Sequence, residues 1–244
     1  MSTLTVFLYI LLTTTISGTL GMAGGAILMA IFLIAFPLPV ALILHGLIQV
    51  SSNGFRAYLN REHIRKEIII PYVVGAALAY VVFAFIQIKP SKKFIFIILG
   101  LMPLLGILKS TSIHFDIEKK GRAFICGLIV SITQALSGVA GGVLDIFYLS
   151  SKLGRFSIVA NKAFSMTIGH TIKTYYFFQV YDFKVTDIPA EIYLVSIITP
   201  LLGGLFGKKI LSKMNDKSFL IVAKTVMIFF SGLMLYRGMS YGVE

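Results

Sequence analysis

An uncharged stretch opens the chain: residues 1–55 contain no Lys, Arg, Asp or Glu. Further charge-free apolar runs cover residues 68–88, 94–108 and 123–144. Stretches of about 18 or more apolar residues match the thickness of the hydrocarbon layer of a bilayer. A soluble domain can bury one such run but not a series of them. The sequence therefore predicts an all-α integral membrane protein with several spans, whose surroundings are the lipid bilayer.

Composition and charge agree with this class. Charged residues make up 13% of the chain and hydrophobic residues 57%, whereas soluble domains average about 25% charged residues. The net charge of +12 does not indicate a nucleic acid partner. The basic residues form short clusters between apolar runs, as in the cytoplasmic loops of membrane proteins. The single cysteine, Cys126, predicts neither a disulfide nor a metal site, and we expect no cofactor.

A five-residue glycine motif occurs twice in the chain. The sequence Gly21-Met-Ala-Gly-Gly25 recurs 117 residues later as Gly138-Val-Ala-Gly-Gly142, and Pro71 and Pro189 begin matching apolar spans. Several matches at nearly one spacing indicate a duplicated unit. We expect two transmembrane repeats, residues 1–120 and 121–244. Together they hold eight apolar segments, at 4–34, 39–58, 68–88, 94–108, 123–150, 156–178, 189–207 and 219–236.

The loop charges indicate how the repeats are oriented. If all eight segments simply cross, Lys and Arg divide almost evenly between the two sides, against the usual cytoplasmic excess. If the first segment of each repeat is a hairpin broken at its glycines, each repeat has three true crossings and the second is inverted. Fourteen basic residues then lie on one side of the membrane. The other side has five: Lys89, Lys92, Lys93, Lys184 and Arg237. We infer an inverted eight-segment bundle, a frequent transporter architecture, with both termini on the outer face.

The paired glycines Gly24-Gly25 and Gly141-Gly142 are candidates for a substrate site. Non-helical backbone at membrane depth is tolerated where it is buried in protein or lines a cavity. The free N–H groups of the helix that follows each break favour an anion. Close helix packing through small residues is the alternative. We favour a site because the break occurs in both repeats.

Polar side chains gather in the helix after each break. In each repeat these polar side chains recur every three or four residues. Each set therefore forms one stripe along its helix. Such stripes face the protein interior, either lining a substrate pathway or hydrogen-bonding between helices. We expect substrate contacts from Gln49, Ser52, Asn53, Asn161, Thr167, His170 and Thr171.

Basic groups in the same two helices are candidates for charge partners or coupling. Arg56 and Lys173 lie near span ends, where they either contact substrate or extend toward the membrane surface. His45 and His170 act either as hydrogen-bonding groups or as groups that titrate near physiological pH.

Asp145 is the one acidic residue inside an apolar stretch. It either pairs with Lys162 or Lys152, couples transport to a proton, or marks where its segment reaches water. No metalloprotease, serine hydrolase or phosphate-binding motif is present in the sequence, so we do not expect an enzyme.

Several of these features together resemble the sulfite exporter and sulfonate permease family, the TauE/SafE type. The resemblance rests on Gly21-Met-Ala-Gly-Gly25, Ala41 through Ser52-Asn53, Gly138-Val-Ala-Gly-Gly142 and Ala160-Asn161 through His170-Thr171. It implies transport of sulfite, thiosulfate or an organosulfonate across the bacterial inner membrane. The chain departs from the family pattern where Ala23, Ala26 and Val143 replace glycines and where neither short arm contains proline.

The sequence thus predicts a transporter that binds a small sulfur anion at the midplane between its repeats and works by alternating access. A transporter or channel for another solute is one alternative, and an intramembrane enzyme is a weaker one, since Asp145 stands alone. Export of a monoanion gains about 2.3 kcal/mol per 100 mV of potential and runs without coupling. Uptake needs a coupling ion, a proton or sodium.

Overall fold

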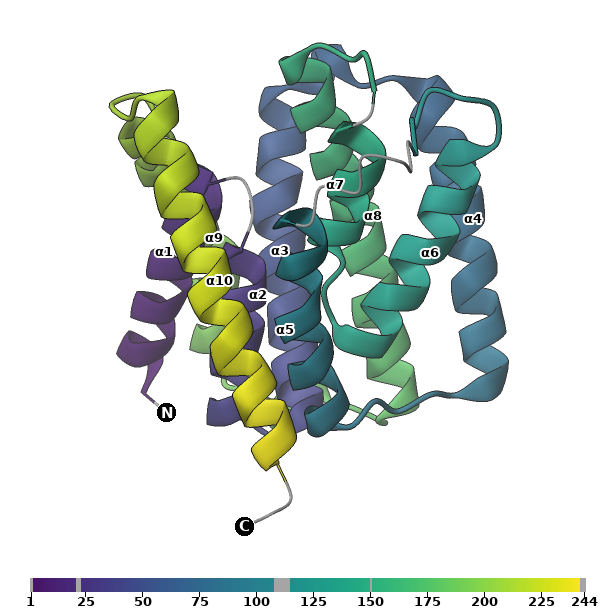
Figure 1. The fold of residues 1–244 in the computed structure, drawn as a ribbon. Coiled ribbons are helices and arrows are strands. Elements are labelled where there is room, and N and C mark those ends of the chain that lie inside the picture. Colours follow the sequence, from purple (N-terminus) through teal and green to yellow (C-terminus); the bar gives the residue numbers. More distant parts are fainter. Residues whose placement is uncertain (1, 21–22, 108–114, 150, 242–244) are drawn as a thin grey trace.

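The computed structural model describes residues 2–20, 23–107, 115–149 and 151–241. These residues form α-helices joined by short loops, and no strand occurs among them, which confirms the all-helical prediction (Figure 1). The helices are α1 (Thr3–Leu20), α2 (Gly24–Ala35), α3 (Leu38–Leu59), α4 (Lys66–Ile86), α5 (Lys92–Ile107), α6 (Arg122–Ser137), α7 (Gly141–Leu149), α8 (Arg155–Val180), α9 (Ala190–Leu211) and α10 (Asp216–Ser240).

The distribution of polar and apolar side chains is that of a membrane protein. Four helices in the described part of the chain, α1, α3, α4 and α9, are long and apolar enough to cross a bilayer. Large apolar side chains such as Phe85 and Phe229 face outward, with 85% and 74% of their surface exposed, while His45 and Lys173 are completely buried. Soluble proteins show the opposite arrangement. The chain is therefore a multi-pass helical membrane protein.

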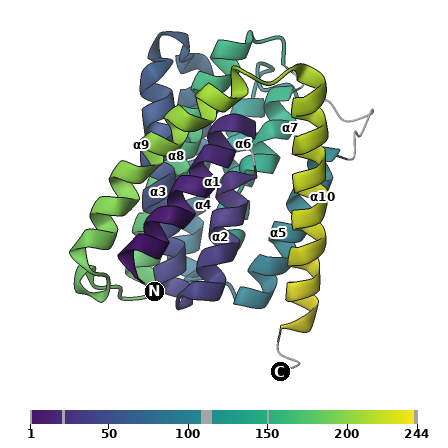
Figure 2. The ribbon, with the colours of Figure 1, turned by 90° about the vertical axis from the view of Figure 1, so that its left-hand side faces the viewer.

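Each of the two glycine-containing segments consists of two helices. The first divides into α1 and α2 and the second into α6 and α7. In each pair the second helix runs back beside the first (Figures 1 and 2). The backbone reverses through positive φ angles, 66° at Ala23 and 76° at Gly138. Gly21, which begins the first motif, lies outside the described residues.

The helices pack in four main pairs: α1 with α9, α4 with α6, α3 with α8, and α5 with α10. Figure 2 shows α1 alongside α9, and Figure 1 shows α3 and α8 in the middle of the bundle. Glycines allow close approach in two of these pairs. The Cα of Gly127 lies against the backbone of Tyr72 between α6 and α4, and Gly207 lies against Gly18 between α9 and α1.

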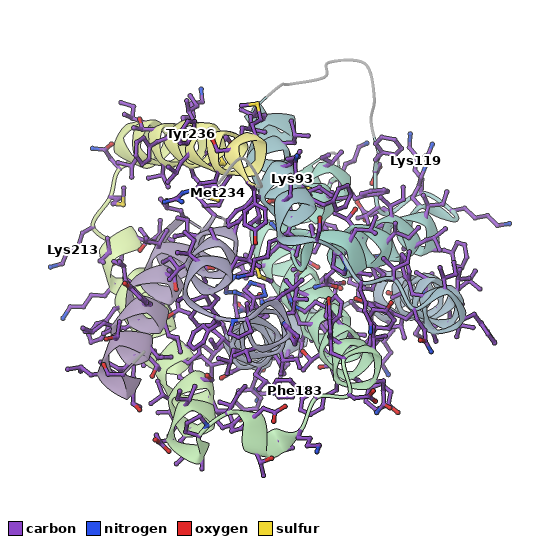
Figure 3. All side chains as sticks on the ribbon, turned by 90° about the horizontal axis from the view of Figure 1, so that it is seen from below. Lys93, Lys119, Phe183, Lys213, Met234 and Tyr236 are labelled. Atoms are coloured by element: carbon purple, nitrogen blue, oxygen red, sulfur yellow. The ribbon has the colours of Figure 1, made fainter. Side chains whose placement is uncertain are left out.

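The start of α1 and the end of α10 lie at the same end of the bundle (Figure 1). Viewed from that end, α10 forms one edge, with Met234 directed into the bundle and Tyr236 directed away from it (Figure 3). Met234 is buried and Tyr236 is exposed, so α10 presents one face to α5 and the other to lipid. α10 thus lies at the edge of the bundle, whereas α3 and α8 lie in its middle and form the polar centre.

Candidate functional site

A chain of hydrogen bonds joins the two helix breaks through the centre of the bundle. The Nε2 atom of His45, on α3, lies 2.9 Å from the carbonyl oxygen of Gly25 in the first turn of α2. The Nζ atom of Lys173, on α8, lies 3.1 Å from His45 Nδ1 and 3.1 Å from the carbonyl oxygen of Gly138. Gly138 ends α6. One histidine and one lysine therefore link both interrupted segments.

A protonated Lys173 would fix the tautomer of His45. An ammonium group has only donors, so His45 Nδ1 accepts its hydrogen bond. The proton of the neutral ring then lies on Nε2, which donates to the carbonyl of Gly25. A lysine has three N–H donors, and two of those on Lys173 are occupied in this way. The third remains available to a ligand.

Lys173 has no acidic partner among the residues that the structure describes. Its side chain is completely buried. A lysine at the centre of a membrane helix costs about 2.5–3.5 kcal/mol on insertion scales, and the two neutral acceptors offset only part of this. An anion that entered the centre would supply the missing charge. Lys173, a candidate for charge pairing from the sequence, lies within the buried polar cluster that joins the two breaks.

Two further polar side chains beside Lys173 lack partners within the described residues. The amide nitrogen and oxygen of Gln134, on α6, are both buried without a hydrogen bond, as is Nδ1 of His170. The ring of His170 packs edge-on against that of His45, with centroids 5.4 Å apart. Gln134 lies against Gly169, where an added Cβ would be only 2.5 Å from Oε1. Gln134 and His170 thus provide hydrogen-bonding groups, and Lys173 provides a positive charge.

Gln134 was missed by the sequence analysis. It lies in the apolar run 123–144, three residues from Ser131 on one side and from Ser137 on the other, and these three buried side chains form a short polar stripe. Its position four residues before Gly138 was a further signal, because one helical turn places it directly beneath the break.

Gln49 and Asn53 lie beside the first break. The Nδ2 atom of Asn53 donates to the backbone oxygen of Gln49, at 2.9 Å, and to its Oε1, at 3.0 Å. The Gln49 amide packs directly on Gly25, where an added Cβ would lie 2.9 Å from Nε2. Ser52 is buried on the same helix. The structure therefore gathers Gln49, Ser52 and Asn53 in the interior.

The two threonines differ in position. Thr167 faces α3, with its methyl group against Gly54, and donates to the carbonyl of Ala163 at 2.8 Å. Thr171 is exposed on the outside of the bundle and donates to the carbonyl of Thr167. It lines a shallow, mostly apolar groove with Leu47 and Tyr175. Thr171 thus lies apart from the central cluster.

The side chain of Asn161 is held by hydrogen bonds to backbone groups. Its Oδ1 accepts from the backbone N–H of Arg65 at 2.9 Å, and its Nδ2 donates to the carbonyls of His63 and Ser157 at 3.1 and 2.7 Å. The side chain therefore fixes the loop between α3 and α4 to α8. All of its principal hydrogen-bonding capacity is used in this way, and it lies apart from Lys173.

Asp145 forms an ion pair with Lys162 and not with Lys152. This contact joins the short helix α7 to α8, and Asp145 is mostly buried while Lys162 is part exposed. Arg56 differs from both lysines. The residue as a whole is part-buried, its guanidinium is enclosed by the protein, and it forms no ion pair or hydrogen bond with the described residues.

The glycine pairs at the two breaks have unequal surroundings. An added Cβ at Gly24 would collide with the carbonyl of Thr13, and one at Gly25 would press on Gln49. At Gly141 an added Cβ would meet no atom of the described residues within 4 Å, and at Gly142 the nearest of those atoms, 3.4 Å away, would be the carbonyl oxygen of Met102. The first break is therefore closely packed, whereas the second has free space at the start of α7.

The fold and the buried polar centre define a multi-pass membrane protein with an interior suited to an anion. A family model described as "Sulfite exporter TauE/SafE" matches residues 6–235. The chain belongs to this family, which confirms the resemblance drawn from the glycine motifs and the polar helices. The family is one of membrane transporters. No curated protein and no solved structure matches the chain.

Proposed function

We propose that this protein transports a small sulfur oxyanion or sulfonate, such as sulfite, thiosulfate or an organosulfonate, and binds it at the bundle centre. The observation that carries the proposal is the completely buried ammonium of Lys173, which has no acidic partner among the described residues. A bound oxyanion would neutralise this charge and accept the third N–H of the lysine. Gln134 and His170 offer N–H groups to its other oxygens.

The helix starts at the two breaks add to this anion site. The first N–H groups of a helix have no partner within the helix and carry partial positive charge. α2 begins at Gly24 and α7 begins at Gly141. The space around Gly141 leaves room for a ligand at the second of these starts. This supports Gly141 and Gly142 as backbone donors to the substrate.

The transport mechanism proposed is alternating access between two inverted repeats, residues 1–120 and 121–244. Its support is the pattern of helix packing. If α1 to α5 correspond to α6 to α10, exchanging the halves converts the α1–α9 pair into the α6–α4 pair. The α3–α8 and α5–α10 pairs convert into themselves. Two such halves can exchange conformations at similar energy, which produces inward-open and outward-open states.

The proposed location is the bacterial inner membrane with both termini on the outer face. The basic loops between the helices, including Arg61, Arg65 and Lys66, then lie on the cytoplasmic side, as the positive-inside rule requires. The membrane potential in that orientation favours export of an anion. Uptake would require a proton or sodium, and Asp145 and the two buried histidines are the candidate coupling groups.

Purified protein in proteoliposomes tests this function. Radiolabelled sulfite, thiosulfate and taurine, as a representative sulfonate, are offered in parallel to protein-containing and protein-free vesicles. We expect saturable flux of at least one of the three that is inhibited by the unlabelled compound. Absence of protein-dependent flux for all three contradicts the substrate class.

A further inference from the structure

Two basic residues occupy equivalent positions in the two central helices. The spacing of 117 residues that relates Gly24 to Gly141 also relates Arg56 to Lys173. The same spacing relates Asn53 to His170. Each central helix therefore carries a hydrogen-bonding side chain followed, three residues later, by a cation.

The cations lie on opposite sides of the point where α3 and α8 cross. Gly46 faces Thr174 and Gly54 faces Thr167, so the helices run antiparallel. Residues 51–52 of α3 therefore cross near residues 168–169 of α8. Arg56 lies four to five residues beyond this crossing in one direction, and Lys173 lies equally far in the other. At 1.5 Å per residue each is about 6–7 Å from the crossing.

The two equivalent cations have different environments in this conformation. Lys173 is completely buried and bonded to His45 and Gly138. Arg56 is part-buried with its guanidinium enclosed by the protein, and that guanidinium has no bonded partner among the described residues. Equivalent residues in unequal environments are what an alternating-access protein shows in any one state, because its halves hold different conformations.

We propose that Arg56 and Lys173 are two equivalent anion-binding positions that exchange environments during transport. In each state one cation is held by neutral acceptors, as Lys173 is here, and the other is left without such bonds, as Arg56 is here. This inference rests on the proposed function and deepens it, because it assigns an anion contact to each half. A planar guanidinium and an ammonium both bind the oxygens of a sulfite or sulfonate group.

The exchange assigns a direction of access to each position. Arg56 lies toward the end of α3 that leads to the basic loop at Arg61 and Arg65. Lys173 lies toward the other end of the bundle, the terminal side, where α1 begins and α10 ends (Figure 1). An anion approaching from the basic-loop side meets Arg56 first. An anion approaching from the terminal side meets Lys173 first.

Thiol labelling tests the sidedness without any substrate. Cysteine replaces Arg56, Lys173 or Thr171 in a Cys126→Ala background, and vesicles of both orientations receive a charged, membrane-impermeant methanethiosulfonate. We expect labelling at position 56 from the basic-loop face alone and at position 173 from the terminal face alone. The control position 171 faces lipid and remains unlabelled. Labelling of positions 56 and 173 from the same face, of either from both faces, or of only one of them overturns the proposal.

Side-specific kinetics provide a second test for variants that tolerate no cysteine. Arg56→Gln and Lys173→Gln are assayed with radiolabelled thiosulfate or sulfite added to one face at a time. Loss of a charged hydrogen bond weakens binding about ten-fold or more. We expect KM to rise about that much from the basic-loop face for Arg56→Gln and from the terminal face for Lys173→Gln. An equal rise from both faces in both variants overturns the exchange.

The two proposals fail in distinguishable ways. Opposite-face labelling without flux of any sulfur anion contradicts the substrate and leaves the exchange intact. Flux of a sulfur anion with same-face labelling contradicts the exchange and leaves the substrate class intact.

Discussion

The ammonium of Lys173 donates to Nδ1 of His45 across 3.1 Å, in a bundle where both side chains are completely buried. The contact joins α8 to α3, and each residue also bonds a carbonyl at a helix break. The two interrupted segments are therefore connected through the pair of helices that any exchange of the halves must move.

Neutralising Lys173 has a different effect on stability from neutralising the paired Lys162. Lys173→Met removes a buried charge that has no acidic partner, so we expect an unchanged or higher melting temperature in detergent. Lys162→Met leaves Asp145 buried without its partner and lowers the melting temperature, because an unpaired buried charge is strongly destabilising. Thermal unfolding of both variants checks this. A large loss of stability in Lys173→Met alone would show that its role is structural.

Gln134→Leu separates binding from packing. Both polar atoms of Gln134 are buried without partners in the described structure, and such groups cost about 1–3 kcal/mol. Leucine removes this cost, so we expect a more stable protein with a KM about ten-fold higher for the transported anion. A less stable variant with unchanged KM would place Gln134 in packing alone.

Ala23→Gly is expected to stabilise the protein. Ala23 has a φ of 66° at the start of α2, in a region that L-residues occupy at a cost of about 1–2 kcal/mol and glycine does not. We expect a gain of about 1 kcal/mol in unfolding experiments in detergent. Glycine also adds backbone freedom to the unfolded chain, and a net loss of stability would mean that this entropy exceeds the strain.

The two glycine pairs should respond differently to alanine. Gly24→Ala forces a Cβ against the Thr13 carbonyl and should reduce the yield of folded protein severely. Gly141→Ala adds a methyl group to open space and should leave stability within about 0.5 kcal/mol of wild type. Size-exclusion chromatography and thermal unfolding measure both. Equal behaviour of the two variants would contradict the difference in packing.

Asn161→Ala should affect stability and spare substrate binding. The side chain holds three backbone groups of the α3–α4 loop and α8 through part-buried hydrogen bonds, and the loss of each such bond costs about 0.5–1.5 kcal/mol. We expect lower thermal stability and an unchanged KM for the transported anion. A raised KM at unchanged stability would return Asn161 to the substrate site.

Hydropathy predicted the helices well because a segment that crosses a bilayer must satisfy its backbone hydrogen bonds internally, as a helix does. The segments at 39–58, 68–88 and 94–108 agree with α3, α4 and α5 to within a few residues. The glycine motifs indicated where the first and fifth segments divide, since Gly24 and Gly141 begin α2 and α7.

Predictions for single residues were correct where the position of a residue on its own helix decides whether its side chain faces the interior. The helical spacing of His45 and Gln49 placed both in the interior, as the structure has them. His170 and Thr171 are adjacent in sequence, so they cannot share one face of a helix, and Thr171 lies outside.

Contacts between distant segments were not predictable from spacing. The contacts of Asn161 depend on the loop at His63 to Arg65, which lies almost 100 residues away in the chain. The choice of Lys162 over Lys152 as partner of Asp145 depends on how α7 packs against α8.

The central claim is that Lys173 is the counter-charge for a transported sulfur anion. The most direct test is flux of radiolabelled sulfite in proteoliposomes under an imposed potential, with wild type and Lys173→Gln measured in parallel and protein content matched. The account predicts saturable flux in wild type that increases when the potential drives the anion. In a folded Lys173→Gln protein it predicts a flux about ten-fold lower when sulfite is added at the terminal face at a concentration well below the wild-type KM. Equal flux in the two proteins would contradict it.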